Sequence, residues 1–170
     1  MTKPFIVRRA GPADAETIAS AHLDSIHAIG PLYYAPEIVG EWGARVSRFL
    51  YLPAMARGEE FFIAIGDVGA GEEVLGFSSH CVDDGQHRTA VYVRGRAARR
   101  GIGSALFERA QAAAMATGAT AIDIDASLAA VEFYLANGFE EVGRGHHRLS
   151  SGQSMPCVFM RKRLTPHAIQ

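Results

Sequence analysis

A basic, glycine-bearing turn near the middle of the chain has the residue types that bind phosphate groups. It follows the apolar run Val91 to Val93 and leads into an amphipathic segment that begins near residue 101. The first amides of a helix have no partner within the helix, and with the helix dipole they attract anions. Glycine has no β-carbon, so a pyrophosphate can approach the backbone closely. The residues expected at this anion site are Arg99, Arg100, Gly101, Ile102, Gly103 and Ser104.

Two common nucleotide-binding motifs do not fit this turn, and one plainer interpretation stays open. A P-loop requires a lysine between its last glycine and the following Ser or Thr, whereas Gly103 is followed directly by Ser104. A dinucleotide-binding fingerprint requires a third glycine or alanine where this chain has Leu106. The remaining alternative is an ordinary helix start that carries surface arginines.

A second group of residues that could do chemistry lies on a predicted helix from Ser127 to Asn137. Ser127, a candidate helix cap, and Tyr134 are seven residues apart, which is about two helical turns, so they should share one face. A phenol in such a position can donate a proton to a leaving group. The alternative is a core aromatic residue with its hydroxyl at the rim of the core.

The elements that must position these residues follow from hydrophobic periodicity and turn signals. Seven strands are expected, at 5–8, 61–65, 74–82, 89–93, 121–125, 141–148 and 155–161. Four helices are expected, at about 12–29, 37–50, 101–117 and 127–137. This order predicts one α/β domain with a mixed, largely antiparallel sheet.

The composition supports a globular domain and excludes several classes of protein. Of 170 residues, 48% are hydrophobic and 21% are charged, which is typical of a chain with a core. The net charge of −1 gives no indication of nucleic-acid or membrane binding. No apolar run resembles a signal peptide or approaches the ~20 residues of a membrane span. We therefore expect a cytoplasmic, single-domain protein, residues 1–170, with its core at about 6–164.

The cysteines and histidines do not have the spacing of a metal site. Cys81 and Cys157 are far apart and form no CxxC pair, so we expect neither a zinc site nor a disulfide. Both thiols lie in apolar contexts and are interpreted as structural. The histidines also lack the close, repeated spacing of metal ligands, so we expect no metal.

The anion turn and the predicted helix together resemble the GNAT superfamily of N-acetyltransferases. The first family motif is Gln/Arg-x-x-Gly-x-Gly/Ala at a strand–helix junction. This chain matches it at Gly101 and Gly103 but has Ala98 at its first position, where Arg99 or Arg100 can supply the missing charge. The second motif, Ala-x-x-Phe-Tyr-x-x-x-Gly-Phe, is matched by Ala130, Phe133, Tyr134, Gly138 and Phe139.

The resemblance, which extends from residue 6 to about 164, implies a fold and a cofactor site. GNAT proteins have an α/β fold of the α+β type, with a mixed, largely antiparallel sheet of seven strands and about four flanking helices. The sheet splays open between strands four and five, and coenzyme A lies in the splay. The pantetheine arm would lie along Val91, Tyr92 and Val93 and pair with the backbone of the two valines. Ser127 and Phe133 would flank the arm, and the amides of residues 99–104 would hold the pyrophosphate.

The resemblance also implies a reaction, which is direct attack of a neutral amine on the thioester of acetyl-CoA. Tyr134 would protonate the departing thiolate. An aliphatic ammonium has a pKa near ~10 and must first lose a proton. No glutamate stands at 89–93, where many family members carry a base. We predict that His80, which shares a strand face with Ser78 and Val82, takes this proton, with His22 as the second choice and bulk water as the alternative.

The acceptor is expected to be a primary amine of a small molecule or a peptide. In this family the first two helices and the last hairpin form the acceptor side, where Tyr33, Tyr34 and Trp42 could pack an apolar group. Acidic residues, Glu37, Glu41, Asp83 and Asp84, could attract a cation there. The rival hypotheses are a preference for longer acyl chains and a non-catalytic acetyl-CoA-binding sensor or scaffold with the same fold. A homodimer is left open.

Overall fold

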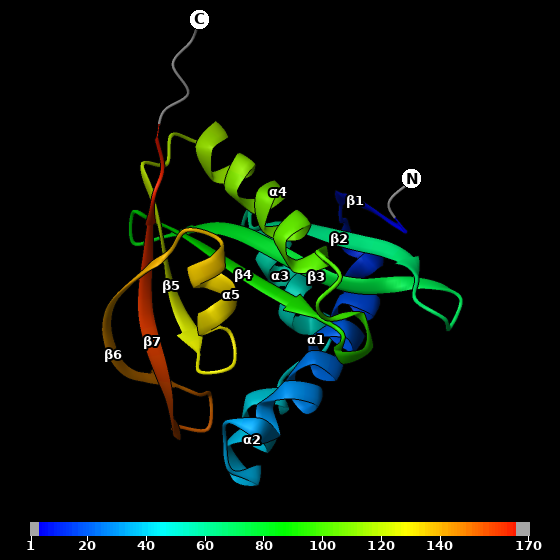
Figure 1. The fold of residues 1–170 in the computed structure, drawn as a ribbon, viewed down its shortest axis with the longest axis horizontal. Coiled ribbons are helices and arrows are strands. Elements are labelled where there is room, and N and C mark those ends of the chain that lie inside the picture. The colour runs from blue at the N-terminus through cyan, green and yellow to red at the C-terminus, as the bar shows by residue number, and fades with distance from the viewer. Residues whose placement is uncertain (1–3, 166–170) are drawn as a thin grey trace, which may run out of the picture.

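The computed structural model describes residues 4–165, and its strands form one seven-stranded sheet (Figure 1). The strand order is β1-β2-β3-β4-β5-β7-β6. The strands are β1 (Phe5–Arg9), β2 (Glu60–Asp67), β3 (Glu72–Asp83), β4 (Gln86–Val93), β5 (Ala121–Ser127), β6 (Glu140–Arg148) and β7 (Ser154–Arg163). All neighbouring strands are antiparallel except β4 and β5, which are parallel. The expected mixed, largely antiparallel sheet is confirmed.

The sheet is splayed between β4 and β5. These strands are joined by one register pair, Arg88 with Asp123, whereas β3 and β4 pair from Gly76↔Val93 to Asp83↔Gln86. Beyond Arg88 the two strands diverge toward their carboxyl ends (Figure 1). The C-terminal half of β4 therefore has a backbone edge that no strand of the described chain covers, as expected for the splay.

Within residues 4–165, five α-helices flank the sheet, one more than the sequence predicted. They are α1 (Ala15–Ile29), α2 (Pro36–Gly43), α3 (Arg48–Ala56), α4 (Ile102–Ala116) and α5 (Val131–Ala136). The prediction of a single helix at 37–50 is wrong, because the chain leaves helical geometry after Gly43 and a separate helix, α3, begins at Arg48. The Ser47 side chain caps this new start by accepting a hydrogen bond from the Phe49 amide at 3.3 Å.

The expected helix at 127–137 also begins too early. Burial alternates through Ile122, Ile124 and Ala126, so period-two strand geometry continues as far as Ser127. A turn follows, in which the Ala130 amide donates to the Ser127 carbonyl at 2.9 Å, and α5 begins at Val131. Ser127 is therefore the last residue of β5 rather than a helix cap, and it does not share a helix face with Tyr134.

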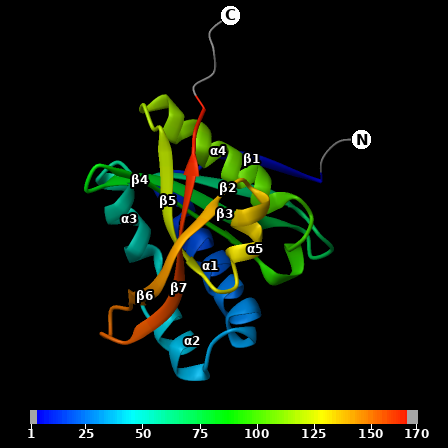
Figure 2. The same ribbon diagram turned by 60° about the vertical axis from the view of Figure 1, so that its left-hand side comes forward.

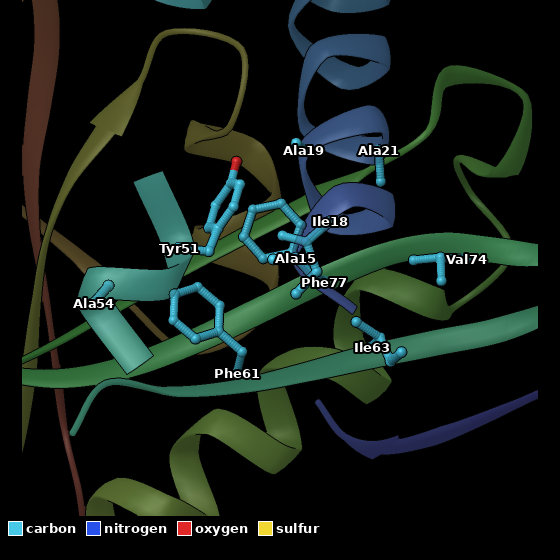
Figure 3. Close-up of a cluster of buried hydrophobic side chains, with 10 residues drawn as sticks. All are labelled: Ala15, Ile18, Ala19, Ala21, Tyr51, Ala54, Phe61, Ile63, Val74 and Phe77. Carbon is cyan, nitrogen blue, oxygen red and sulfur yellow. The ribbon is translucent and has the colours of Figure 1, made fainter. Parts of the chain in front are cut away.

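The helices cover both faces of the sheet (Figure 2). Ile18 of α1 and Tyr51 of α3 pack with Phe61 and Phe77 of the strands in one buried cluster (Figure 3). We call this side of the sheet the α1 face. On the other side, the α4 face, Phe107, Ile122, Tyr134, Val158 and Met160 form a second cluster that joins α4 and α5 to β5 and β7.

No helix within residues 4–165 has both the length and the apolar character needed to cross a bilayer. The predicted domain of residues 1–170 includes positions 1–3 and 166–170, which lie outside the described residues.

Candidate active site

The start of α4 is open in the way that an anion site requires. Gly101 is the N-cap residue, with a left-handed φ of 78°, and no side chain caps the helix. The first bond of the helix runs from the Ala105 amide to the Gly101 carbonyl at 3.1 Å. The amides of Ile102, Gly103 and Ser104 consequently have no helical partner. They lie beside the exposed side chains of Arg99 and Arg100.

The backbone of this turn is held in an uncommon conformation. Arg99 has a positive φ of 60°, which is rare for a residue other than glycine and costs roughly 1–2 kcal/mol. Left-handed residues within a turn can direct successive amides toward one side and so form an anion-binding concavity. A β-carbon built on Gly101 would meet no atom within 4 Å, so the space in front of the turn is open.

Gly103 has a different role from the one that the sequence suggested. A β-carbon there would lie 2.9 Å from the ring of Phe133, so this glycine allows α5 to pack against the start of α4. The structure thus brings Phe133 and the anion turn together, as the predicted cofactor site requires.

Arg94 anchors the turn to the rest of the fold, a role that the sequence analysis missed. It is buried, and its Nε donates to the Val74 carbonyl at 2.7 Å. Its Nη2 donates to Ser20 Oγ at 3.0 Å, and the next residue, Gly95, donates its amide to Asp24 Oδ1 at 2.9 Å. The turn is therefore fixed to helix α1, and arginine spacing in the sequence gave no sign of this.

The wall of the splay on the β4 side offers free backbone groups. The Arg94 amide donates to the Leu75 carbonyl at 2.8 Å, so Tyr92 also turns its backbone groups toward β3. By the same alternation, Val91 and Val93 turn their amides and carbonyls toward the splay. An extended ligand with amide groups can pair with such an edge as an added strand does.

Tyr134 of α5 closes the splay opposite this wall. Its side chain is buried, with ring centroids 5.0 Å from Phe133 and 5.1 Å from Phe139. Burial raises the pKa of Tyr134, and nearby Tyr92 acts in the same direction, while a hydrogen bond from the Val91 backbone partly opposes them. The phenol is therefore protonated at neutral pH, and its ring packs in the buried cluster that Val91, at the predicted pantetheine wall, also joins.

His22 lies on the α1 face against the aromatic residues of the sheet. Its Nδ1 is 2.6 Å from the Tyr51 hydroxyl, and its ring centroid is 4.0 Å from that of Tyr92. Burial lowers the pKa of His22 to about 3, so the imidazole is neutral at physiological pH. Its Nε2 is buried and has no hydrogen-bond partner within residues 4–165.

His80 lies on the opposite face of the sheet from His22. It shares its strand face with Ser78, whose Oγ donates to the Leu106 carbonyl of α4 at 2.7 Å. His80 Nε2 is 2.9 Å from His87 Nδ1, and the two rings are stacked. Burial and His87 lower the pKa of His80, while Glu60 opposes them from 3.7 Å. The structure therefore does not bring the two predicted bases together.

Aromatic residues gather on the α1 face beside the splay. The Tyr34 hydroxyl accepts from the Leu128 amide at 2.8 Å and donates to the Pro156 carbonyl at 2.7 Å, so it bridges the ends of β5 and β7. The Trp42 ring centroid is 5.9 Å from that of Tyr34 and 6.3 Å from that of Tyr92. Burial raises the pKa of Tyr92 to about 12, and a hydrogen bond from Trp42 opposes this shift. Tyr33, by contrast, is exposed.

One charged group in the splay was missed by the sequence analysis. Arg88 Nη2 and Asp125 Oδ1 form an ion pair at 2.9 Å, and His147 Nδ1 lies 3.6 Å from Asp125 Oδ2. Alternation within each strand could not relate Arg88 to Asp125, because their partnership depends on the parallel pairing of β4 with β5. In residues 4–165, no cluster of three or more His, Cys, Asp or Glu residues is arranged to hold a metal ion.

A family model described as an acetyltransferase (GNAT) domain matches residues 57–141. No curated protein matches the chain in sequence.

Solved structures of similar fold span nearly the whole chain. A GCN5-related N-acetyltransferase from Rhodopseudomonas palustris is 25% identical, with a TM-score of 0.80, and the match covers 96% of this chain and 98% of that one. PaiA N-acetyltransferase from Thermoplasma acidophilum, solved with coenzyme A, is 18% identical, with a TM-score of 0.74 and coverage of 96% and 100%. A phosphinothricin acetyltransferase from Sinorhizobium meliloti, solved with acetyl-CoA, is 19% identical, with a TM-score of 0.66 and coverage of 95% and 89%.

Proposed function

The chain belongs to the GNAT family of acetyltransferases, and on that premise we propose that it moves an acetyl group from acetyl-CoA to a primary amine of a small molecule or peptide. The observation that carries the proposal is the position of Tyr134. Its side chain is buried in a cluster that Val91 of β4 also joins, beside the wall along which the thioester of acetyl-CoA would lie. A proton donor is thus available beside the expected leaving group.

The residues present fit acetyl-CoA as the co-substrate. The uncapped amides of Ile102 to Ser104 and the charges of Arg99 and Arg100 suit the pyrophosphate. The free edge of Val91 and Val93 suits the amides of the pantetheine arm. Structures of the same fold contain coenzyme A or acetyl-CoA, which supports the same cofactor here.

The proposed reaction is direct transfer in a complex that holds both substrates. The amine nitrogen forms a bond to the acetyl carbon, the carbon–sulfur bond breaks, and the electron pair leaves on sulfur. The nitrogen then releases its extra proton to solvent, from which the Tyr134 phenol regains the proton that it gives to sulfur. Tyr134 donates its hydrogen bond, and then its proton, to that sulfur. Burial raises the pKa of the phenol, so Tyr134 keeps its proton until negative charge develops on the sulfur.

A covalent route through cysteine is less well supported. Burial raises the pKa of Cys81 to about 11 and also raises that of Cys157, so neither thiol is activated at neutral pH. Direct attack needs no such nucleophile.

The proton of the ammonium needs its own route. His22 is a weak base, because an imidazole with a pKa of about 3 binds a proton only in acid. His80 lies on the opposite face of the sheet, stacked on His87, and its pKa is also lowered by burial. Both remain predictions for the base, and we favour loss of the proton to water before the amine attacks.

The test is a panel of amines, antibiotics and peptides offered with acetyl-CoA, with thiol release and mass spectrometry of the products as readouts. We expect release of coenzyme A together with an acetylated amine. Tight binding of acetyl-CoA without turnover on any member of the panel would instead favour the alternative, a sensor or scaffold, which the departure at Ala98 also allows.

We also propose a setting for this activity. The chain would act as a single domain in the cytoplasm, where its two free cysteines stay reduced, without a nucleic-acid or membrane partner. Size-exclusion chromatography with light scattering decides between a monomer and a homodimer.

A further inference from the structure

The ion pair of Arg88 and Asp125 lies at the vertex of the splay. Arg88 belongs to the register pair that joins β4 to β5, and Asp125 is two residues beyond its partner Asp123. Ile122, Ile124 and Ala126 are buried on the α4 face, so Asp125 points to the α1 face by alternation. Arg88 points to the same face, because it pairs with Cys81 of β3. Cys81 is four residues after Phe77, so both side chains lie on the α1 face.

The surroundings of Arg88 place its charge on the acceptor side. Arg88 stands opposite Cys81 in the register of β3 and β4, and its guanidinium reaches Asp125 of β5, so its charge spans the vertex of the splay. It shares the α1 face of β4 with Tyr92, four residues away, at a spacing of about 13 Å along the strand. The vertex therefore carries charge, and the other end of the same wall is aromatic.

Stability alone gives little reason for this pair. The side chains of Arg88 and Asp125 are 27% and 29% exposed, and a pair so open to water typically contributes about 0–1 kcal/mol. A guanidinium has five N–H donors in a planar fork that suits a carboxylate, and Asp125 engages one terminal nitrogen at the pairing distance. A ligand carboxylate can therefore join Asp125 on the same cation.

We propose that Arg88 binds the carboxylate of the acceptor, and that the acceptor is a free amino acid. The inference rests on the proposed transfer to an amine. With the carboxylate on Arg88, the ammonium can first meet Asp125 and then, once neutral, attack the thioester beside Tyr134. The side chain of the amino acid extends along β4 toward Tyr92, Trp42 and Tyr34. An exposed pair of opposite charges is thus complementary to a zwitterion.

The experiment compares matched substrates in matched variants. Alanine, methionine and phenylalanine are each assayed beside the corresponding decarboxylated amine, in wild type, Arg88→Gln, Arg88→Lys and Arg161→Gln. Arg161 is the control because it pairs with Asp123 at 2.7 Å, two residues from Asp125 on the same strand. The readout is the ratio of kcat/KM for the amino acid to that for its amine. The amino acid and its amine differ in amine pKa, but this difference affects the ratio equally in every variant. It therefore cancels when the ratios of two variants are compared.

We expect wild type to prefer at least one amino acid over its amine. Arg88→Gln should lower that ratio by about 10-fold or more, because a charged hydrogen bond typically contributes about 1.5–3 kcal/mol. Arg88→Lys should retain part of the preference, and Arg161→Gln should keep the ratio within about twofold of wild type.

Two results would overturn the inference while leaving the proposed function intact. One is turnover of amines with no preference for a carboxylate in wild type. The other is an equal loss on amino acids and amines in Arg88→Gln, which would mean that the pair only holds β4 against β5. Absence of turnover on every amine would overturn the proposed function, and this inference with it.

Discussion

Phe133 packs so closely over Gly103 that a β-carbon at position 103 would lie 2.9 Å from its ring. Gly101, two residues earlier, has open space around its α-carbon and a left-handed backbone. The two glycines of the turn therefore have separate roles. Gly103 lets α5 pack on the start of α4, and Gly101 allows the chain to enter the helix with its amides exposed.

Gly103→Val is expected to lower both stability and affinity for acetyl-CoA. The branched side chain must displace the Phe133 ring, and overpacking of this kind typically costs about 1–3 kcal/mol. The displaced ring is expected to flank the pantetheine arm beside the anion turn, so we expect acetyl-CoA binding at least ~10-fold weaker, or about 1.4 kcal/mol. Thermal unfolding and calorimetry on the same samples measure the two effects. Equal affinity in wild type and variant would contradict the assigned pyrophosphate site.

Arg99→Gly is expected to separate binding from stability. Arg99 has a φ of 60°, a region that glycine occupies without strain, so the variant should be about as stable as wild type. Loss of the charge should weaken acetyl-CoA binding several-fold, and the deficit should shrink as salt is raised. Arg99→Ala is the control, since it removes the charge but keeps the strained backbone. Unchanged affinity in both variants would show that the turn binds through its amides alone.

The anion turn could be predicted from sequence because its chemistry is local. The run from Val91 to Ser104 contains the strand end, the glycines and the arginines of one continuous segment. The positions of the seven strands along the chain also followed from period-two patterns and turn residues. These signals each involve neighbours in the chain, and pattern reasoning captures such neighbours well.

Residues that act across the fold were not predictable in the same way. Arg88 meets Asp125 only because β4 and β5 lie parallel, and Arg94 reaches Ser20 only because α1 packs under the turn. The break between α2 and α3 was missed because apolar residues continue through 44–50 at a spacing that suits either one helix or two. The face of His80 depends on which side α4 occupies, which the sequence does not state.

Tyr134→Phe is expected to lower turnover while leaving acetyl-CoA binding nearly intact. The phenyl ring keeps the contacts with Phe133 and Phe139, so the change isolates the hydroxyl. General acid catalysis typically contributes ~100-fold or more. Turnover at saturating substrate is the readout, with pre-steady-state kinetics to establish that chemistry limits the rate. An unchanged rate under those conditions would return Tyr134 to a packing role.

Because the buried imidazole of His22 resists protonation, we expect the free energy of unfolding to fall as the pH is lowered. Its folded-state pKa is lowered to about 3 from an ordinary value near 6.5, so the unfolded chain binds a proton that the folded chain rejects. Its contribution to the free energy of unfolding is therefore complete above about pH 6.5. Below that pH, the contribution declines by up to ~1.4 kcal/mol per pH unit until about pH 3.

His22→Gln should flatten this part of the stability profile. Urea unfolding at several pH values between 4 and 7 gives the slope, which is compared within each variant so that a change in overall stability does not matter. His27→Gln is the matched control, because His27 is an exposed residue of the same helix. The same slope in His22→Gln as in wild type would contradict the buried, neutral imidazole.

The pH dependence of kcat/KM decides whether a histidine takes the proton of the amine. A base that must be neutral gives an acidic limb at its own pKa, whereas loss of the proton to water leaves only the limb of the amine itself. We expect wild type, His22→Gln and His80→Gln to share one acidic limb, at a position that moves with the pKa of the amine chosen as acceptor. The physical reason is that burial lowers the pKa values of both imidazoles, and His80 is stacked on His87.

Two acceptors of different amine pKa make this test sharp. If the limb stays at one pH for both acceptors and disappears in His80→Gln, then His80 is the base, and its strand must present the ring to the cleft in the complex. If it disappears in His22→Gln instead, the ring beside Tyr92 accepts the proton through its unpartnered Nε2. If the acidic limb shifts with the pKa of the amine in all three proteins, then the amine loses its proton to water, because the amine is the only group whose titration affects kcat/KM.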